Sequence, residues 1–127
     1  MVVSSSFTLE QCVNEGETSL YTATIKDENG AVIPGSSLDS LTLTLYTLEA
    51  QTIINSRDSQ NILGANGGAV DGSGVLTMEL NELDNAIINN TLDIEWREML
   101  FKWTYATATR TGRHVKSYAV RNLSKVP

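Results

Sequence analysis

The sequence predicts an all-β fold, an antiparallel sandwich of two packed sheets. Apolar and polar residues alternate with a period of two in several short segments, as they do in strands with one buried face. Turn signals rich in Gly, Asn and Asp separate these segments, as at residues 27–30 and 71–74. At 127 residues the chain fits one domain, and we expect residues 1–127 to form it.

The first half of the chain contains two alternating segments. In residues 18–26 one predicted strand face carries Ser19, Tyr21, Ala23 and Ile25. The Asn29-Gly30 pair favours a tight turn after it, and Pro34 places the short strand 31–33 at an edge or a strand end. The second segment, residues 41–46, turns Leu41, Leu43 and Leu45 inward and leaves an outer face of Thr42, Thr44 and Tyr46.

The middle of the chain is more polar. Residues 51–54 form a further β-branched piece, and residues 55–68, rich in Asn and Gly, predict a long exposed loop anchored by Ile62 and Leu63. Residues 75–80 form a strand with Leu76, Met78 and Leu80 on one face. Asn81 can cap a short helical turn over residues 83–88, with Asp84 favouring its positive end.

The last third contains the largest group of aromatic residues. Residues 95–105 predict a central core strand with an inward face of Met99, Phe101, Trp103 and Tyr105. Residues 110–113 predict a basic hairpin turn, and residues 114–123 the return strand, with Tyr118 and Val120 toward the core. Together the segments predict a single antiparallel immunoglobulin-like β-sandwich of about seven strands with one short helix.

Composition limits the partners. The formal charge of -6 repels phosphate groups and anionic lipids, so we expect neither nucleic acid nor a membrane as partner. No apolar run approaches the ~20 residues that cross a bilayer, and the first residues lack the features of a signal peptide, which favours synthesis in a cytoplasm. Cys12, the sole cysteine, excludes an internal disulfide, and the alternation of residues 7–13 predicts it to be buried.

Catalytic chemistry finds little support. His114 is the one histidine, and beside Arg113 at a hairpin exit it is interpreted as a solvated surface residue. Acid-base pairing of Glu95 with Glu98, or of Asp58 with Asp71, could in principle provide a pair of catalytic carboxylates. In an acidic protein, however, such pairs of carboxylates occur by chance. No phosphate-binding or metal-ligand spacing is present in the sequence. We therefore expect no enzyme activity and no cofactor.

Four segments together carry a resemblance. The stretches YTATIKDENG (21–30), LTLTLY (41–46), DGSGVL (71–76) and LFKWT (100–104) resemble small immunoglobulin-like proteins of tailed bacteriophage particles. The layout is also similar to the N-terminal domain of phage baseplate upper proteins. The resemblance implies a virion structural protein, made in the host bacterial cytoplasm, that binds other virion proteins of the capsid, neck or tail as a homo-oligomer or in many copies.

Two functional hypotheses follow. The first is a head decoration or head-to-tail neck component, with a tail or baseplate adaptor as its alternative; its candidate interface residues are Thr42, Thr44, Tyr46, Arg57, Asp58 and Asn66. The second is a carbohydrate- or cell-surface-binding module that would stack sugar rings on Trp96, Tyr46 or Tyr105. An aromatic ring exposed beside polar loops would favour the second hypothesis.

Overall fold

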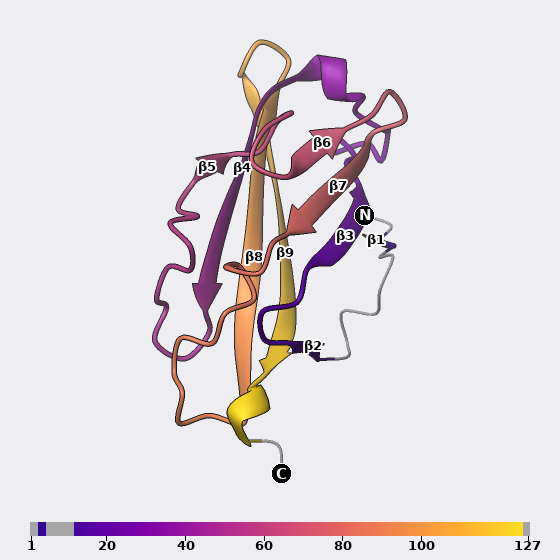
Figure 1. Ribbon diagram of the computed structural model, residues 1–127. Coiled ribbons are helices and arrows are strands. Elements are labelled where there is room, and N and C mark those ends of the chain that lie inside the picture. The colour runs from indigo at the N-terminus through magenta and orange to yellow at the C-terminus, as the bar shows by residue number, and fades with distance from the viewer. Residues whose placement is uncertain (1–2, 5–11, 126–127) are drawn as a thin grey trace.

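A computed structural model describes residues 3–4 and 12–125 of the chain, and confirms the all-β, sandwich-like arrangement of two sheets (Figure 1). The described residues form nine strands instead of the seven or so expected: β1, β2, β5 and β6 were not foreseen, whereas the expected pieces at 31–33 and 51–54 form only isolated bridges. The strands are β1 (Val3–Ser4), β2 (Val13–Asn14), β3 (Ser19–Thr24), β4 (Leu38–Thr47), β5 (Gln60–Asn61), β6 (Gly68–Val70), β7 (Val75–Leu80), β8 (Ile94–Tyr105) and β9 (Arg110–Arg121). Two 3-10 turns, Gly35–Ser37 and Leu123–Lys125, complete the described elements.

The strands are divided between a four-stranded sheet, β1-β3-β7-β6, and a five-stranded sheet, β2-β9-β8-β4-β5. The pairs are antiparallel, as expected, except that β2 runs parallel to the end of β9. The long strands β8 and β9 continue past the end of β4 (Figure 1). That overhang leaves room at one end of the sandwich for the loops that form the site described below.

The core lies between the sheets. The inward faces predicted for β4, β7 and β8 are confirmed: Leu41, Leu43, Leu45, Leu76, Met78, Leu80, Met99, Phe101 and Trp103 are all buried. Tyr21 of β3 stacks on Phe101 of β8 with ring centroids 5.7 Å apart, which joins the two sheets. These strands therefore bury most of the face that their pattern indicated; the exception in β8 is Tyr105, which was predicted to face inward but is half-buried and donates to Glu28.

Several local predictions were wrong. The β8–β9 turn is at residues 106–109, not 110–113, and Gly112 instead lies within β9 opposite Trp103. A Cβ atom at Gly112 would lie less than 3.0 Å from three atoms of the Trp103 indole. A glycine is therefore required here because the indole packs against its backbone, and not because the chain turns. Asn81 caps a turn as predicted, but this is a single turn and does not continue as a helix over 83–88. Residues 31–33 make an isolated bridge instead of a strand.

The burial of Cys12 is a further correction. Most of the 7–13 run lies outside the described residues, but Cys12 is exposed and its neighbour Val13 is buried. Because successive strand side chains point to opposite faces, inward Val13 turns Cys12 outward.

Candidate functional site

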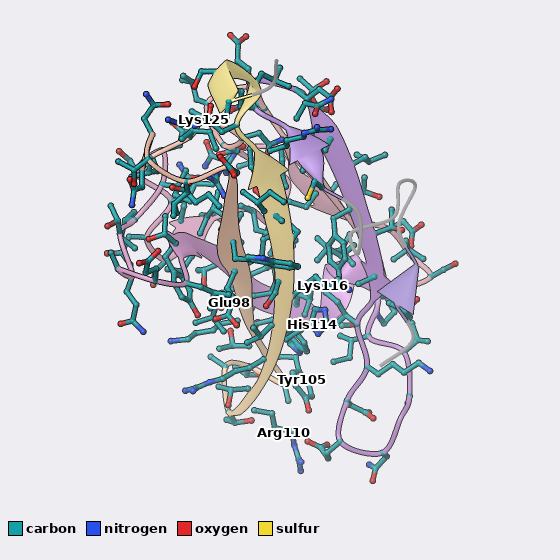
Figure 2. The ribbon with its side chains drawn as sticks, turned by 90° about the horizontal axis from the view of Figure 1, so that it is seen from below. Glu98, Tyr105, Arg110, His114, Lys116 and Lys125 are labelled. Atoms are coloured by element: carbon teal, nitrogen blue, oxygen red, sulfur yellow. The ribbon has the colours of Figure 1, made fainter. Side chains whose placement is uncertain are left out.

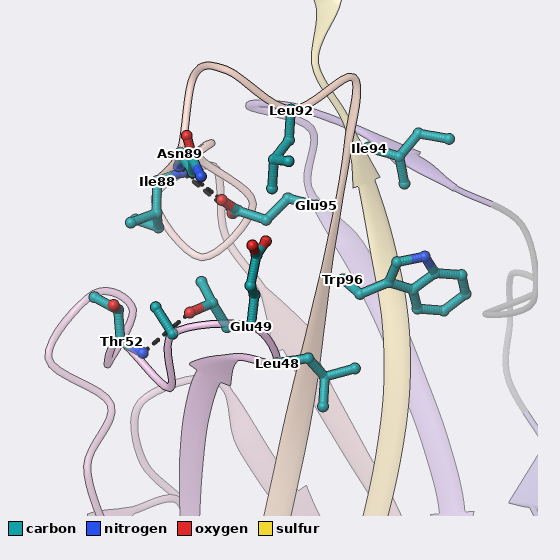
Figure 3. A pocket seen from close by; sticks show the side chains of 11 residues that line it. Leu48, Glu49, Thr52, Ile88, Asn89, Leu92, Ile94, Glu95 and Trp96 are labelled. Carbon is teal, nitrogen blue, oxygen red and sulfur yellow. Dashed lines mark hydrogen bonds between the residues drawn. The ribbon is translucent and has the colours of Figure 1, made fainter.

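An open apolar groove lies at the end of the sandwich where β8 begins. Its volume is about 500 Å³, within the range of ligand sites in proteins. The loop after β4, residues 48–52, forms one wall, and residues 88–92 form the other (Figure 3). The lining consists of Thr47, Leu48, Glu49, Ala50, Thr52, Ile88, Asn89, Leu92, Ile94, Glu95 and Trp96.

Large apolar side chains around the groove are unusually open to solvent. Leu48, Ile88, Ile94 and Trp96 are 41%, 45%, 44% and 48% exposed. Figure 3 shows Glu95 directed toward Ile88 and Asn89, while Ile94 and Trp96 point to the opposite side of β8. The exposed apolar side chains therefore lie on two sides of β8: Ile88 belongs to the groove wall, and Ile94 and Trp96 form an exposed apolar patch of the kind typical of an interaction surface.

A buried ion pair holds residues 81–88 against the rest of the sandwich. Asp84 is fully buried, and its carboxylate binds the guanidinium of Arg57 at Nε and, at 2.9 Å, at Nη2. The same carboxylate accepts the backbone N–H of Asn81 at 2.8 Å, while the Asn81 side chain accepts the N–H of Asp84 at 3.0 Å. This reciprocal cap closes the turn, and the ion pair with Arg57 ties the turn to the segment that follows β4.

A second buried pair supports the groove wall itself. Arg97 of β8 is fully buried and donates to the carbonyl oxygens of Asp84 (2.6 Å) and Ala86 (3.0 Å) and to the carboxylate of Glu95. Glu95 in turn accepts the backbone N–H groups of Ile88 (3.2 Å) and Asn89 (2.7 Å). The start of the wall is therefore hydrogen-bonded to β8 through side chains.

Two asparagines complete the attachment. The Tyr118 hydroxyl donates to Asn85 at 2.9 Å, and the Asn85 amide donates to the Glu17 carbonyl oxygen at 2.7 Å. The buried Asn122 amide donates to the Leu92 carbonyl oxygen at 3.0 Å. Residues 81–92 are thus anchored at their start, middle and end, so the protein's own hydrogen bonds hold this wall of the groove in place.

No family model, curated protein or solved structure matches the chain. The site is therefore interpreted from its own residues.

The candidate interface residues do not come together in this groove. Thr42, Thr44 and Tyr46 lie half-buried on the outer face of the five-stranded sheet, opposite Lys102, Leu100 and Glu98 of β8. Tyr46 donates a hydrogen bond to Glu98, and this bond, with a smaller contribution from burial, raises the pKa of Tyr46 to about 12.

The other three candidates follow β4. Asp58 and Asn66 are exposed, whereas Arg57 is buried against Asp84 and is not available on a contact surface. Arg57 also donates to the Asn66 carbonyl oxygen at 3.0 Å, so this segment is internally braced. Ile88 and Leu92 were not identified as binding residues from the sequence. The one signal that could have indicated them is that both are apolar residues within a polar stretch.

The candidate sugar-stacking residues differ in exposure. Trp96 is exposed at the groove, as that hypothesis requires, whereas Tyr46 and Tyr105 are half-buried and bonded to Glu98 and Glu28. Trp103 is buried in the core, as its alternation indicated.

The carboxylates considered for acid-base chemistry are placed apart or engaged in turns. Glu95 is buried on the inner face of β8, whereas Glu98 points to the outer face and accepts from Ser117 at 3.2 Å. Asp71 accepts the backbone N–H groups of Ser73 and Val75, both at 2.9 Å. Within residues 3–4 and 12–125, no group of three or more His, Cys, Asp or Glu side chains is placed to hold a metal ion.

No helix in the described part of the chain is long and apolar enough to cross a membrane.

His114 is not the solvated residue expected from the sequence. It lies within β9, near Lys116 (Figure 2) and half-buried, and its Nε2 is 2.6 Å from the Tyr21 hydroxyl. Its ring also stacks on Phe101 with centroids 6.1 Å apart. Burial, with a smaller contribution from Lys116, lowers the pKa of His114 from 6.5 to about 4.

This environment predicts acid sensitivity. Because the unfolded chain binds the His114 proton more readily, stability should fall by about 2 kcal/mol, allowing for partial exposure, as pH drops from 6.5 toward 4. Urea unfolding at several pH values, compared with His114→Gln, isolates this contribution from that of the carboxylates. The difference between the two proteins should change through this window and level off below it; parallel curves would contradict the assignment.

Proposed function

We propose that this chain is a structural or accessory protein of a tailed bacteriophage particle and that it attaches to a neighbouring virion protein through the groove. The observation that carries the proposal is the apolar groove itself, whose wall is braced by buried ion pairs. A site that is ordered before binding loses little conformational entropy when a partner docks. The resemblance to immunoglobulin-like virion proteins supplies the setting: a head decoration or neck component, or alternatively a tail or baseplate adaptor.

A comparison of groove variants tests the proposal. Ile88→Asp combined with Leu92→Asp places two charges on the apolar wall and should reduce incorporation into particles more than about tenfold, as expected for a central contact. Tagged variants would be expressed during infection and quantified in purified particles by mass spectrometry. Leu83→Asp is the matched control, because Leu83 is 60% exposed in the same loop but outside the groove lining.

The folding of the double variant and the incorporation of a variant on the outer sheet face decide how the comparison is interpreted. Circular dichroism and urea unfolding must show that the double variant is folded. Equal incorporation of the folded double variant and of Leu83→Asp would contradict the proposal. Loss of incorporation in Thr44→Arg alone would instead move the contact to the outer sheet face of Thr42, Thr44 and Tyr46.

The exposure of Trp96 keeps glycan binding as a second candidate. An exposed indole offers a flat apolar face on which a sugar ring can stack. Its neighbours Leu48 and Ile94 are apolar, however, and supply none of the side-chain hydrogen bonds that fix a sugar. Saturable binding on a glycan array that Trp96→Ala abolishes and Trp96→Phe retains would favour this candidate.

A further inference from the structure

The groove carries charge of one sign. Among its described lining residues, the two charged side chains are Glu49 and Glu95, and the lining contains no Lys, Arg or His. One of these carboxylates is already compensated, because Glu95 is buried and ion-paired with Arg97. Its oxygens also accept the backbone N–H groups of Ile88 and Asn89.

Glu49 is different. It is exposed, and it makes no hydrogen bond or ion pair with any residue that the structure describes. Figure 3 shows its side chain directed toward Glu95, across the groove from the loop that carries Ile88 and Leu92. The Glu49 carboxylate therefore lies beside the apolar wall of the groove without a counter-charge among the described residues.

We infer that the occupant of the groove is a segment of a partner protein in which a lysine or arginine lies beside a large apolar side chain. The inference rests on the proposed role of the groove in protein binding and adds the chemistry of the partner. The aliphatic stem of a lysine can pack along Ile88 and Leu92 while its ammonium group reaches the Glu49 carboxylate. The adjacent apolar side chain fills the rest of the groove.

Charge also argues against other occupants. An acidic segment would bring like charges together at Glu49, which is unfavourable. A second copy of this chain is disfavoured because each copy carries a net charge of -6. A basic, apolar segment is the occupant that complements both the wall and the carboxylate.

Selection from a displayed library of short random peptides tests this chemistry. The intact chain is immobilised, and enriched peptides are sequenced and their affinities measured by titration. We expect enrichment of Lys or Arg next to Leu, Ile, Phe or Trp. Binding of these peptides should fall at least about tenfold in Glu49→Lys and in Leu92→Asp. The control Glu82→Lys changes an exposed carboxylate outside the lining and should bind as the parent does.

The outcomes separate the inference from the proposed function. Peptides that depend on Leu92 but show no basic residue, or that bind Glu49→Lys unchanged, would overturn the inference while leaving groove binding in place. Peptides that bind Leu92→Asp as well as the parent would overturn both. Sedimentation that shows a dimer of the chain, lost in Leu92→Asp, would replace the basic segment with a second copy and likewise overturn the inference.

Discussion

Replacing Asp84 by Ala should lower the free energy of unfolding by about 3–5 kcal/mol. The Asp84 side chain is fully buried, and its carboxylate is the ionic partner of Arg57, which is itself 4% exposed. Truncation would leave the guanidinium in the interior without its counter-charge. It would also remove the acceptor for the Asn81 backbone N–H and for the Asn55 amide at 2.9 Å.

Urea unfolding of two further variants makes this test specific. Asp58→Ala, an exposed carboxylate next to Arg57 in the sequence, should change stability by no more than about 0.5 kcal/mol. The double variant Arg57→Met with Asp84→Leu removes both charges and should recover much of the loss, since apolar pairs often replace buried ion pairs at little cost. A loss in Asp84→Ala no larger than in Asp58→Ala would contradict the buried pair.

Replacing Arg97 by Met should also cost about 3–5 kcal/mol, and in addition should loosen the groove wall. Arg97 compensates the buried Glu95 and donates to the carbonyl oxygens of Asp84 and Ala86. Its guanidinium carbon lies 5.9 Å from the centroid of the Tyr118 ring, a further favourable contact of cation and aromatic face. Its buried Nε atom has no hydrogen-bond partner among the described residues, and because removing that atom relieves a cost, we expect a loss near the lower end of this range.

Amide hydrogen exchange measures the loosening directly. The Ile88 and Asn89 amides bind the Glu95 carboxylate, so their exchange should accelerate more in Arg97→Met than that of amides in β3 and β7. Arg121→Met is the control, because the Arg121 side chain is exposed at the end of the same sheet. Unchanged protection of both amides in folded Arg97→Met would show that Glu95 holds the wall without its partner.

The alternation of apolar residues was sufficient to predict the long strands β3, β4, β7, β8 and β9, but not how they divide between the two sheets. Leu41, Leu43 and Leu45 repeat without interruption, and a period of two admits only one buried face. The same rule, extended back from Phe101, would have placed Glu95 and Arg97 in the interior. Their charge obscured that position, because buried charges require partners that local sequence does not reveal.

Partners distant in the sequence explain the remaining differences. Arg57 and Asp84 are separated by 27 positions, and nothing in either neighbourhood indicates that they meet. His114 shares the strand face of Tyr118 and Val120, so its burial could have been read from the period, but its contact with Tyr21 comes from the other sheet. Gly112 was mistaken for a turn signal because its reason, the indole of Trp103, lies on the neighbouring strand.

The groove could not be predicted from the sequence because it too depends on segments that are distant in the chain. Its walls come from two loops that only the strand overhang at one end of the sandwich brings face to face. Ile88 and Leu92 belong to no alternating segment, so no periodicity assigned them a face. Their positions are set by hydrogen bonds that hold the backbone of this loop to the strands, and these leave Ile88 exposed and Leu92 half-buried.

The proposal that this chain belongs to a phage particle can be tested by electron microscopy of particles purified from its source, with mass spectrometry of the same sample. Our account predicts the chain at symmetric positions on the head, neck or tail. The groove around Ile88 and Leu92 should be filled by a segment of a neighbouring virion protein. Absence of the chain from particles, or its presence with the groove open to solvent, would contradict the account.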